Sequence, residues 1–67
     1  MNIVDTGSRI RQRRRSLGIS QRDLAEIAGV SLHTLSDVES GKGNPTLTIL
    51  SRILEPLGLE LAIRIRQ

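Results

Sequence analysis

The amino-acid sequence predicts an all-α fold: a compact domain of four to five short helices, followed by one β-strand at the C-terminal end. Three observations support this fold class. Apolar residues recur at helical spacing behind helix-capping residues, turns that contain glycine separate these stretches, and the apolar period changes to two after Gly58. A chain of 67 residues has room for one domain only, over residues 1–67.

The composition limits what can stabilise this domain. The sequence contains no cysteine, no aromatic residue and one histidine, His33, which argues against disulfides and against a zinc site. A small aliphatic core is marginal by itself, and a second copy of the chain is the simplest source of further buried area. Without a nucleophile–base pair or a cluster of metal ligands, the sequence predicts neither enzymatic activity nor a cofactor.

The net charge of +3 is unevenly distributed along the chain. Residues 1–22 carry six arginines and one acid, whereas acids outnumber bases in residues 23–60. A basic pole beside an acidic body suits a polyanion such as nucleic acid or anionic lipid, but arginines interrupt the apolar stripe that a lipid surface would need. The sequence has neither an export signal nor an apolar run that could span a bilayer, so we expect a cytoplasmic protein.

The first helix is expected over about Thr6–Leu17, near the N-terminus. Asp5 or Thr6 would serve as its N-cap, and Gly18 would end it. The apolar side chains at helical spacing in this segment are Ile10 and Leu17.

Two arginines stand where this helix should face the core. Arg13 and Arg14 occupy the positions that would complete its apolar stripe. One of the two guanidinium groups must therefore lie against the core. A buried guanidinium is costly unless a carboxylate meets it, so the sequence requires an acidic partner from another element.

A helix-turn-helix is expected in the centre of the chain. Ser20 followed by Asp23 is a variant of the capping box that starts a second helix, which ends at Gly29. Ser31 caps a third helix over Leu32–Ser40, so that two short helices are joined by a turn containing glycine. The positions expected to face inward on the third helix are Leu35, Val38 and Thr34. Those expected to face outward are Leu32, His33, Ser36, Asp37 and Ser40.

A loop and a fourth helix follow. The segment Gly41–Pro45 is a loop by composition, and Thr46 caps the next helix. Pro56 and Gly58 limit its last turn. Its apolar side chains are Leu47, Leu50, Ile53, Leu54 and Leu57.

The last segment, residues 58–67, is expected to be a dimerisation strand. Apolar and other residues alternate in it, which is typical of a β-strand. A single strand in a helical chain has no partner of its own, and pairing with the same strand of a second molecule is the simplest remedy. In an antiparallel ribbon centred on Ile63, Glu60 would face the partner's Arg66. The residues of the expected interface are Leu59, Leu61, Ile63 and Ile65.

About fifteen positions agree in order and spacing with a known family. They read Ile10-Arg11-x-x-Arg14-x-x-x-Gly18-Ile19-Ser20-Gln21-x-x-Leu24-Ala25-x-x-x-Gly29-Val30-Ser31-x-x-x-Leu35-Ser36-x-x-Glu39-x-Gly41. This pattern resembles the helix-turn-helix family of the phage Cro and repressor proteins, also called the xenobiotic-response-element family. The resemblance covers roughly Gly7–Gly58 and implies a lambda-repressor-like DNA-binding domain. The short form with a terminal strand looks like HipB-type antitoxins, whose homodimers join through such a strand.

The resemblance supplies the acid that the first helix requires. In the family, the position of Arg14 pairs with a glutamate at the position of Glu39. Glu39 follows Val38, which lies on the core face of the third helix. The alternative is that Arg14 extends to the surface and Glu39 is solvated. If the pair is buried, removing Glu39 alone should be strongly destabilising.

The resemblance also implies which residues meet DNA. The third helix would enter the major groove and read bases through Ser31, Leu32, His33, Ser36 and Asp37. Phosphates would be held around two helix N-termini and the loop by Ser20, Gln21, Ser40, Lys42, Asn44 and Thr46. One or two arginines of residues 9–15 should approach the DNA backbone. For His33 and Asp37, a purely solvated role is the alternative.

These features predict a homodimeric, sequence-specific repressor of a palindromic double-stranded DNA site. Within this class the chain would be a phage-type repressor, a restriction–modification controller or the antitoxin of a toxin protein. The alternative from another class is a protein-interaction module, such as a toxin-neutralising scaffold, that does not bind DNA. Single-strand binding is disfavoured because the sequence has no aromatic side chain on which bases could stack.

Overall fold

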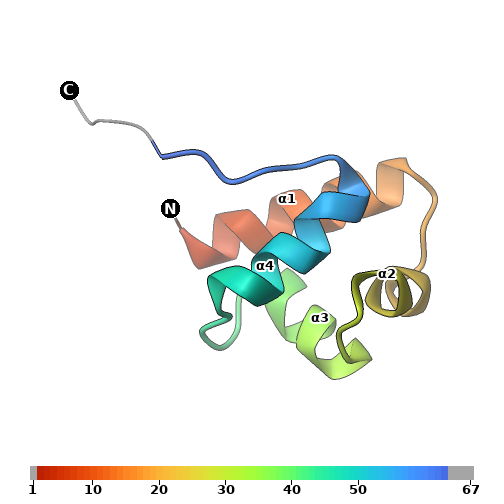
Figure 1. Cartoon of the computed structure of the whole chain (residues 1–67), viewed down its shortest axis with the longest axis horizontal. Coiled ribbons are helices and arrows are strands. Elements are labelled where there is room, and N and C mark those ends of the chain that lie inside the picture. The colour runs from red at the N-terminus through yellow and green to blue at the C-terminus, as the bar shows by residue number, and fades with distance from the viewer. Residues whose placement is uncertain (1, 64–67) are drawn as a thin grey trace.

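The computed structural model describes residues 2–63 as a small helical domain (Figure 1). Its elements are α1 (Ile3–Ser16), α2 (Gln21–Ala28), α3 (Leu32–Glu39), α4 (Leu47–Leu54) and the 3-10 helix η1 (Glu55–Leu57). In Figure 1, α2 and α3 lie below α1, and the segment after η1 runs back above α1 toward the N-terminus. None of the helices in residues 2–63 is long and apolar enough to cross a membrane.

The starts of α2, α3 and α4 agree with the sequence prediction. Each begins behind a hydroxyl side chain that accepts a backbone N–H of the first turn. Ser20 accepts from Asp23 N at 3.0 Å, Ser31 accepts from Thr34 N at 3.0 Å, and Thr46 accepts from Ile49 N at 3.1 Å. Gly29 ends α2 in the left-handed region with a φ of 71°.

The predicted start of α1 was wrong by one turn. The helix begins at Ile3, and the N-cap is Asn2, whose side-chain oxygen accepts from Val4 N at 2.9 Å. Asp5 and Thr6 therefore lie inside the first turn instead of capping it. Asparagine is as good an N-cap as aspartate, and the cap three residues earlier lets the helix take in Ile3 and Val4.

The core lies where α1, α2, α3, α4 and η1 meet. Its buried side chains are Ile10, Leu24, Ala25, Ala28, Leu35, Val38, Leu50, Ile53, Leu54 and Leu57. Two apolar residues expected to face this core do not reach it. Leu17 is 43% exposed because it caps the C-terminus of α1, where the chain turns away, and Leu47 in the first turn of α4 is 69% exposed.

The end of α4 also departs from a single regular helix. The α-helix stops at Leu54, and Glu55–Leu57 continue as a 3-10 turn that contains Pro56. Gly58 then adopts a φ of 69°, and Leu59 N donates to Leu54 O at 3.0 Å. This turn buries Leu57 and directs the following residues back along α1.

The predicted C-terminal strand is not formed in residues 59–63, which are extended but have no regular secondary structure. A strand requires a ladder of hydrogen bonds to a neighbour, and the single chain supplies none to this segment in residues 2–63. Leu59 packs against the core, whereas Leu61 and Ile63 are exposed. Ile65 lies outside the described residues. Pairing of this segment with a second chain stays a prediction.

Candidate nucleic-acid interface

The helix-turn-helix is formed by α2 and α3, joined by the short turn Gly29–Ser31. The N-caps of the two helices, Ser20 and Ser31, are both exposed. Free backbone N–H groups and the helix dipole make a helix N-terminus favourable for anions. The positions of α2 and α3 thus present two such ends to solvent.

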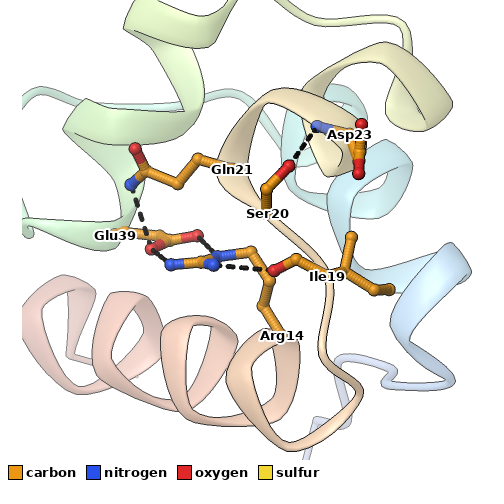
Figure 2. Close-up of polar contacts among 6 residues, drawn as sticks. All are labelled: Arg14, Ile19, Ser20, Gln21, Asp23 and Glu39. Atoms are coloured by element: carbon orange, nitrogen blue, oxygen red, sulfur yellow. Dashed lines mark hydrogen bonds and ion pairs between the residues drawn. The ribbon is translucent and has the colours of Figure 1, made fainter.

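A buried ion pair ties α1 to the end of α3 (Figure 2). Arg14 Nε donates to Glu39 Oε2 at 2.7 Å, and Arg14 Nη2 donates to Glu39 Oε1 at 3.0 Å, which is a bidentate arrangement. Arg14 Nη1 donates further to the carbonyl of Ile19 at 2.8 Å. The structure thus brings together the two residues that the resemblance pairs, and it buries both.

The surroundings of Arg14 favour its charged form. Hydrogen bonds to Glu39, aided by the attraction of its charge, raise the pKa of Arg14 above the usual arginine value, although burial acts in the opposite direction. The guanidinium therefore remains charged at any pH at which the protein would be handled. Because the carboxylate of Glu39 neutralises this charge directly, the pair can be buried without leaving an uncompensated charge.

Gln21 extends the ion pair to the start of α2. Its Nε2 donates to Glu39 Oε1 at 3.1 Å, so the first residue of α2 is bonded to the last residue of α3 (Figure 2). The sequence predicted Gln21 as a phosphate ligand and did not predict this contact. The bond holds the half-buried Gln21 side chain beside the N-terminus of α2, where a phosphate contact was expected.

The outer face of α3 carries the candidate base readers. Leu32 is 42% exposed, and the His33 side chain is 88% exposed. His33 Nε2 lies 3.3 Å from Asp37 Oδ2, one turn further along the helix. The hydroxyl of Ser31 is occupied within the protein, because it caps α3 and also donates to Thr34 Oγ1 at 2.8 Å. Ser36 is half-buried on the same helix.

The loop after α3 returns along the flank of this helix. Lys42 N donates to the carbonyl of Asp37 at 2.9 Å, and a shallow cleft runs between α3 and the loop. Residues from both sides line it, including Asp37, Lys42 and Asn44. The candidate phosphate ligands of this region are all exposed; they are Ser40, Lys42, Asn44 and Thr46.

The candidate dimerisation residues lie elsewhere. Leu59 and Leu61 line a groove with the N-cap Asn2 and with Arg9 of α1. The segment after η1 runs on the side of α1 away from α2 and α3 (Figure 1). The structure therefore separates the two predicted sites, with α1 between them. Within residues 2–63, no group of three or more histidine, cysteine or acidic side chains is arranged to hold a metal ion.

Two further contacts were not predicted from the sequence. Arg13 Nε donates to the carbonyl of Leu57 at 2.9 Å, which links α1 to the turn that precedes the C-terminal segment. Gly7 lies against α3 so closely that an added Cβ would stand 2.1 Å from the carbonyl oxygen of Val38. The available signal was Gly7 itself, a glycine inside a helix and one turn before Ile10 on the same face.

The fold and these helix ends define a helix-turn-helix domain of the kind that binds DNA. A family model described as helix-turn-helix matches residues 10–63. The chain therefore belongs to the Cro/C1-type helix-turn-helix family of DNA-binding transcriptional regulators, as its sequence pattern indicates.

Similar proteins agree with this assignment. An HTH-type transcriptional regulator of Methanothermobacter thermautotrophicus is 41% identical over 51 residues, which is 76% of this chain and 74% of that protein. One of Haemophilus influenzae is 42% identical over 50 residues, and the match covers 75% of this chain but only 51% of that protein. Among solved structures, the restriction–modification controller protein C.AhdI of Aeromonas hydrophila superposes with a TM-score of 0.80 at 31% identity, covering 87% of this chain and 88% of that one.

Proposed function

We propose that this chain is a sequence-specific double-stranded DNA-binding repressor that binds a palindromic operator as a homodimer. The observation that carries the proposal is the exposed outer face of α3, flanked by the N-terminus of α2 and by the loop that precedes α4. A helix presented in this way fits the major groove, and the flanking groups fit the phosphates on either side. Membership of a family of transcriptional regulators supports it.

Base reading is assigned to the outer face of α3. Leu32 offers an apolar contact to a thymine methyl, and His33 offers a hydrogen bond to a base edge. Asp37 is suited to accept from a cytosine amino group. Its proximity to His33 supports a paired role, since a lone carboxylate would be repelled by the backbone phosphates. Ser31 and Ser36 complete the predicted set of base readers.

Phosphate binding is assigned to groups that carry no base information. At the start of α2, these are Ser20 and Gln21, the latter held by Glu39. Around the loop and the start of α4, they are Ser40, Lys42, Asn44 and Thr46. Because each is at or beside a helix end or in a loop, backbone N–H groups can contribute as well.

The interface of the proposed homodimer is assigned to the C-terminal segment, residues 58–67. The exposed apolar side chains of Leu61 and Ile63 support it, since a chain with so small a core gains buried area from a second copy. Two copies related by a two-fold axis would read the two halves of a palindrome about one helical turn of DNA apart.

Selection from a random duplex library tests the proposal directly. The expected product is a palindrome with half-sites about 10 base pairs apart, bound by two chains. If a dimer neutralises about eight phosphates, the logarithm of affinity should fall with the logarithm of salt concentration at a slope near −7. A random pool that yields no enriched sequence, together with a nearly flat salt slope, would contradict DNA binding.

The alternative is a protein-interaction module that uses the helix-turn-helix only as a scaffold. Such a module would lack salt-dependent duplex binding, so the same titration separates the two. Within the DNA-binding class, the likeness to a restriction–modification controller supports a controlling role. The neighbouring open reading frame distinguishes such a controller from the antitoxin of a toxin protein.

A further inference from the structure

The arginines of α1 between positions 9 and 15 divide into two groups. Three have partners within the protein: Arg9 with Asp5 at 3.2 Å, Arg13 with the Leu57 carbonyl at 2.9 Å, and Arg14 with Glu39 at 2.7 Å. The other two, Arg11 and Arg15, are exposed. Neither side chain makes a hydrogen bond or an ion pair with another residue of the 2–63 range.

The helix places Arg11 and Arg15 on one flank of α1. Successive residues of an α-helix are about 100° apart, so Arg11 and Arg15 lie about 60° and 100° to one side of the buried Arg14. Arg13 and Arg9 lie to the other side by the same geometry, and there the helix faces Leu57 and the C-terminal segment. The two unpartnered arginines therefore point away from that segment.

The flank of Arg11 and Arg15 borders the candidate DNA-binding loop. Val4 lies on this flank, about 80° from Arg14, and its backbone packs against Gly41, where an added Cβ would stand 2.9 Å from Val4 Cα. Gly41 adjoins Lys42 and the other candidate phosphate ligands of the loop. The flank thus adjoins this loop at the N-terminal end of α1, about two turns before Arg11.

The spacing of the two arginines is unfavourable within the protein. Like charges four residues apart on a helix repel each other, and no acid among the described residues compensates them. The dipole of α1 favours a cation in its last turn, which accounts for Arg15 but not for Arg11, one turn earlier. An external anion would relieve the repulsion of both.

We propose that Arg11 and Arg15 form a phosphate-binding pair for the backbone of duplex DNA, extending the contact from the helix-turn-helix to α1. This inference rests on the proposed DNA-binding function and assigns to it two residues that the sequence left undecided. Guanidinium groups are well suited to phosphate oxygens, and the contact carries no base information. The pair should strengthen binding to all duplexes to the same degree.

The test is a salt titration of the double variant Arg11→Gln/Arg15→Gln, with the selected operator and a random-sequence duplex as probes. The loss of two phosphate contacts per chain, or four per dimer, should make the slope shallower by about 3.6. Both probes should lose affinity by the same factor, so the ratio between them is kept. The thermal midpoint should stay close to that of the wild type, because the removed repulsion offsets the lost attraction between Arg15 and the helix dipole.

Arg9→Gln is the matched control, since Arg9 is also exposed but lies on the other flank. It should leave the slope of the wild type unchanged. A double variant with the wild-type slope would overturn the inference, as would an Arg9→Gln variant that loses as much. If an Arg15→Gln variant lowered the thermal midpoint and left the salt slope unchanged, Arg15 would only stabilise the C-terminus of α1. That result would contradict the proposed phosphate-binding pair. A wild type with a flat slope would overturn the proposed function itself.

Discussion

Arg14 and Glu39 show how one pair of residues can organise a small core. Three hydrogen bonds leave the Arg14 guanidinium, two to Glu39 and one to Ile19, and Glu39 also accepts from Gln21. Residues from α1, α2, α3 and the turn between α1 and α2 are thereby joined at one point. In a domain with no aromatic side chain, this network fixes how three helices meet.

Glu39→Gln should therefore destabilise the protein strongly. The substitution keeps the shape of the side chain but leaves the Arg14 guanidinium buried without a counter-charge, at an expected cost of about 3–5 kcal/mol. A guanidinium keeps its proton at neutral pH even without a carboxylate partner, so deprotonation cannot relieve the charge in this variant. Urea unfolding measures the loss, and Glu26→Gln at an exposed position is the control.

A variant that replaces both partners by apolar residues, Arg14→Met/Glu39→Leu, separates charge from packing. It should recover most of the stability lost in Glu39→Gln, since no buried charge remains. A loss below about 1 kcal/mol in Glu39→Gln would instead mean that water reaches the pair and that its burial contributes little.

At the scale of the elements, α1 and α3 approach each other through a glycine. The Cα of Gly7 faces the carbonyls of Val38 and Glu39, and a Cβ there would stand 2.1 Å and 3.0 Å from their oxygens. No side chain fits between these backbones. The close approach brings Arg14, two turns further along α1, within reach of the end of α3.

Gly7→Ala should accordingly lower stability although alanine is the better helix former. Alanine alone would stabilise the helix by up to about 1 kcal/mol. Forcing α1 away from the backbone of α3 should cost more, about 2–3 kcal/mol net, as overpacking does. Thermal unfolding shows whether Gly7→Ala raises or lowers the stability. The control is Ser8→Ala on the exposed side of α1, which should leave the stability nearly unchanged. A Gly7→Ala variant more stable than the wild type would contradict the close contact.

The helices also show what local sequence signals can and cannot predict. Ser20, Ser31 and Thr46 are followed by apolar residues at helical spacing, and all three N-caps were predicted correctly. The α1 start was missed because two capping candidates, Asp5 and Thr6, stand nearer the clear apolar position Ile10 than Asn2 does. A local pattern identifies a cap but does not choose between neighbouring caps.

Contacts between elements were less accessible from the sequence. The Arg14–Glu39 pair could be anticipated, because a guanidinium on a core face requires an acid and the family pattern indicates which one. The bonds from Gln21 to Glu39 and from Arg13 to Leu57 could not, because they depend on how helices far apart in the chain are placed. Pairing of the C-terminal segment, if it occurs, would involve a second chain, and contacts of that kind cannot be derived from one chain.

At the scale of the whole molecule, two separate faces lie on opposite sides of α1. The helix-turn-helix and the loop before α4 lie on one side of α1, and the extended segment after Gly58 lies on the other (Figure 1). Arginines contribute to both sides: Arg13 anchors the turn before the segment, and Arg11 lies on the opposite flank. This separation would allow two chains to associate through one face while both present α3 to DNA.

Ile63→Lys tests this arrangement. Ile63 is fully exposed in the single chain, and in a two-fold ribbon centred on it the residue would face its own copy. Two lysines at that position would repel, so the variant should sediment with the mass of one 7.4 kDa chain, while the wild type sediments with twice that mass. The loss of the dimer should also lower the affinity for a palindromic duplex, whereas binding to a single half-site should be kept.

Ile27→Lys is the control for this variant. It places a lysine on the exposed side of α2, at a residue that is 62% exposed, and the protein should remain dimeric. An Ile63→Lys variant that stays dimeric would move the interface away from the C-terminal segment.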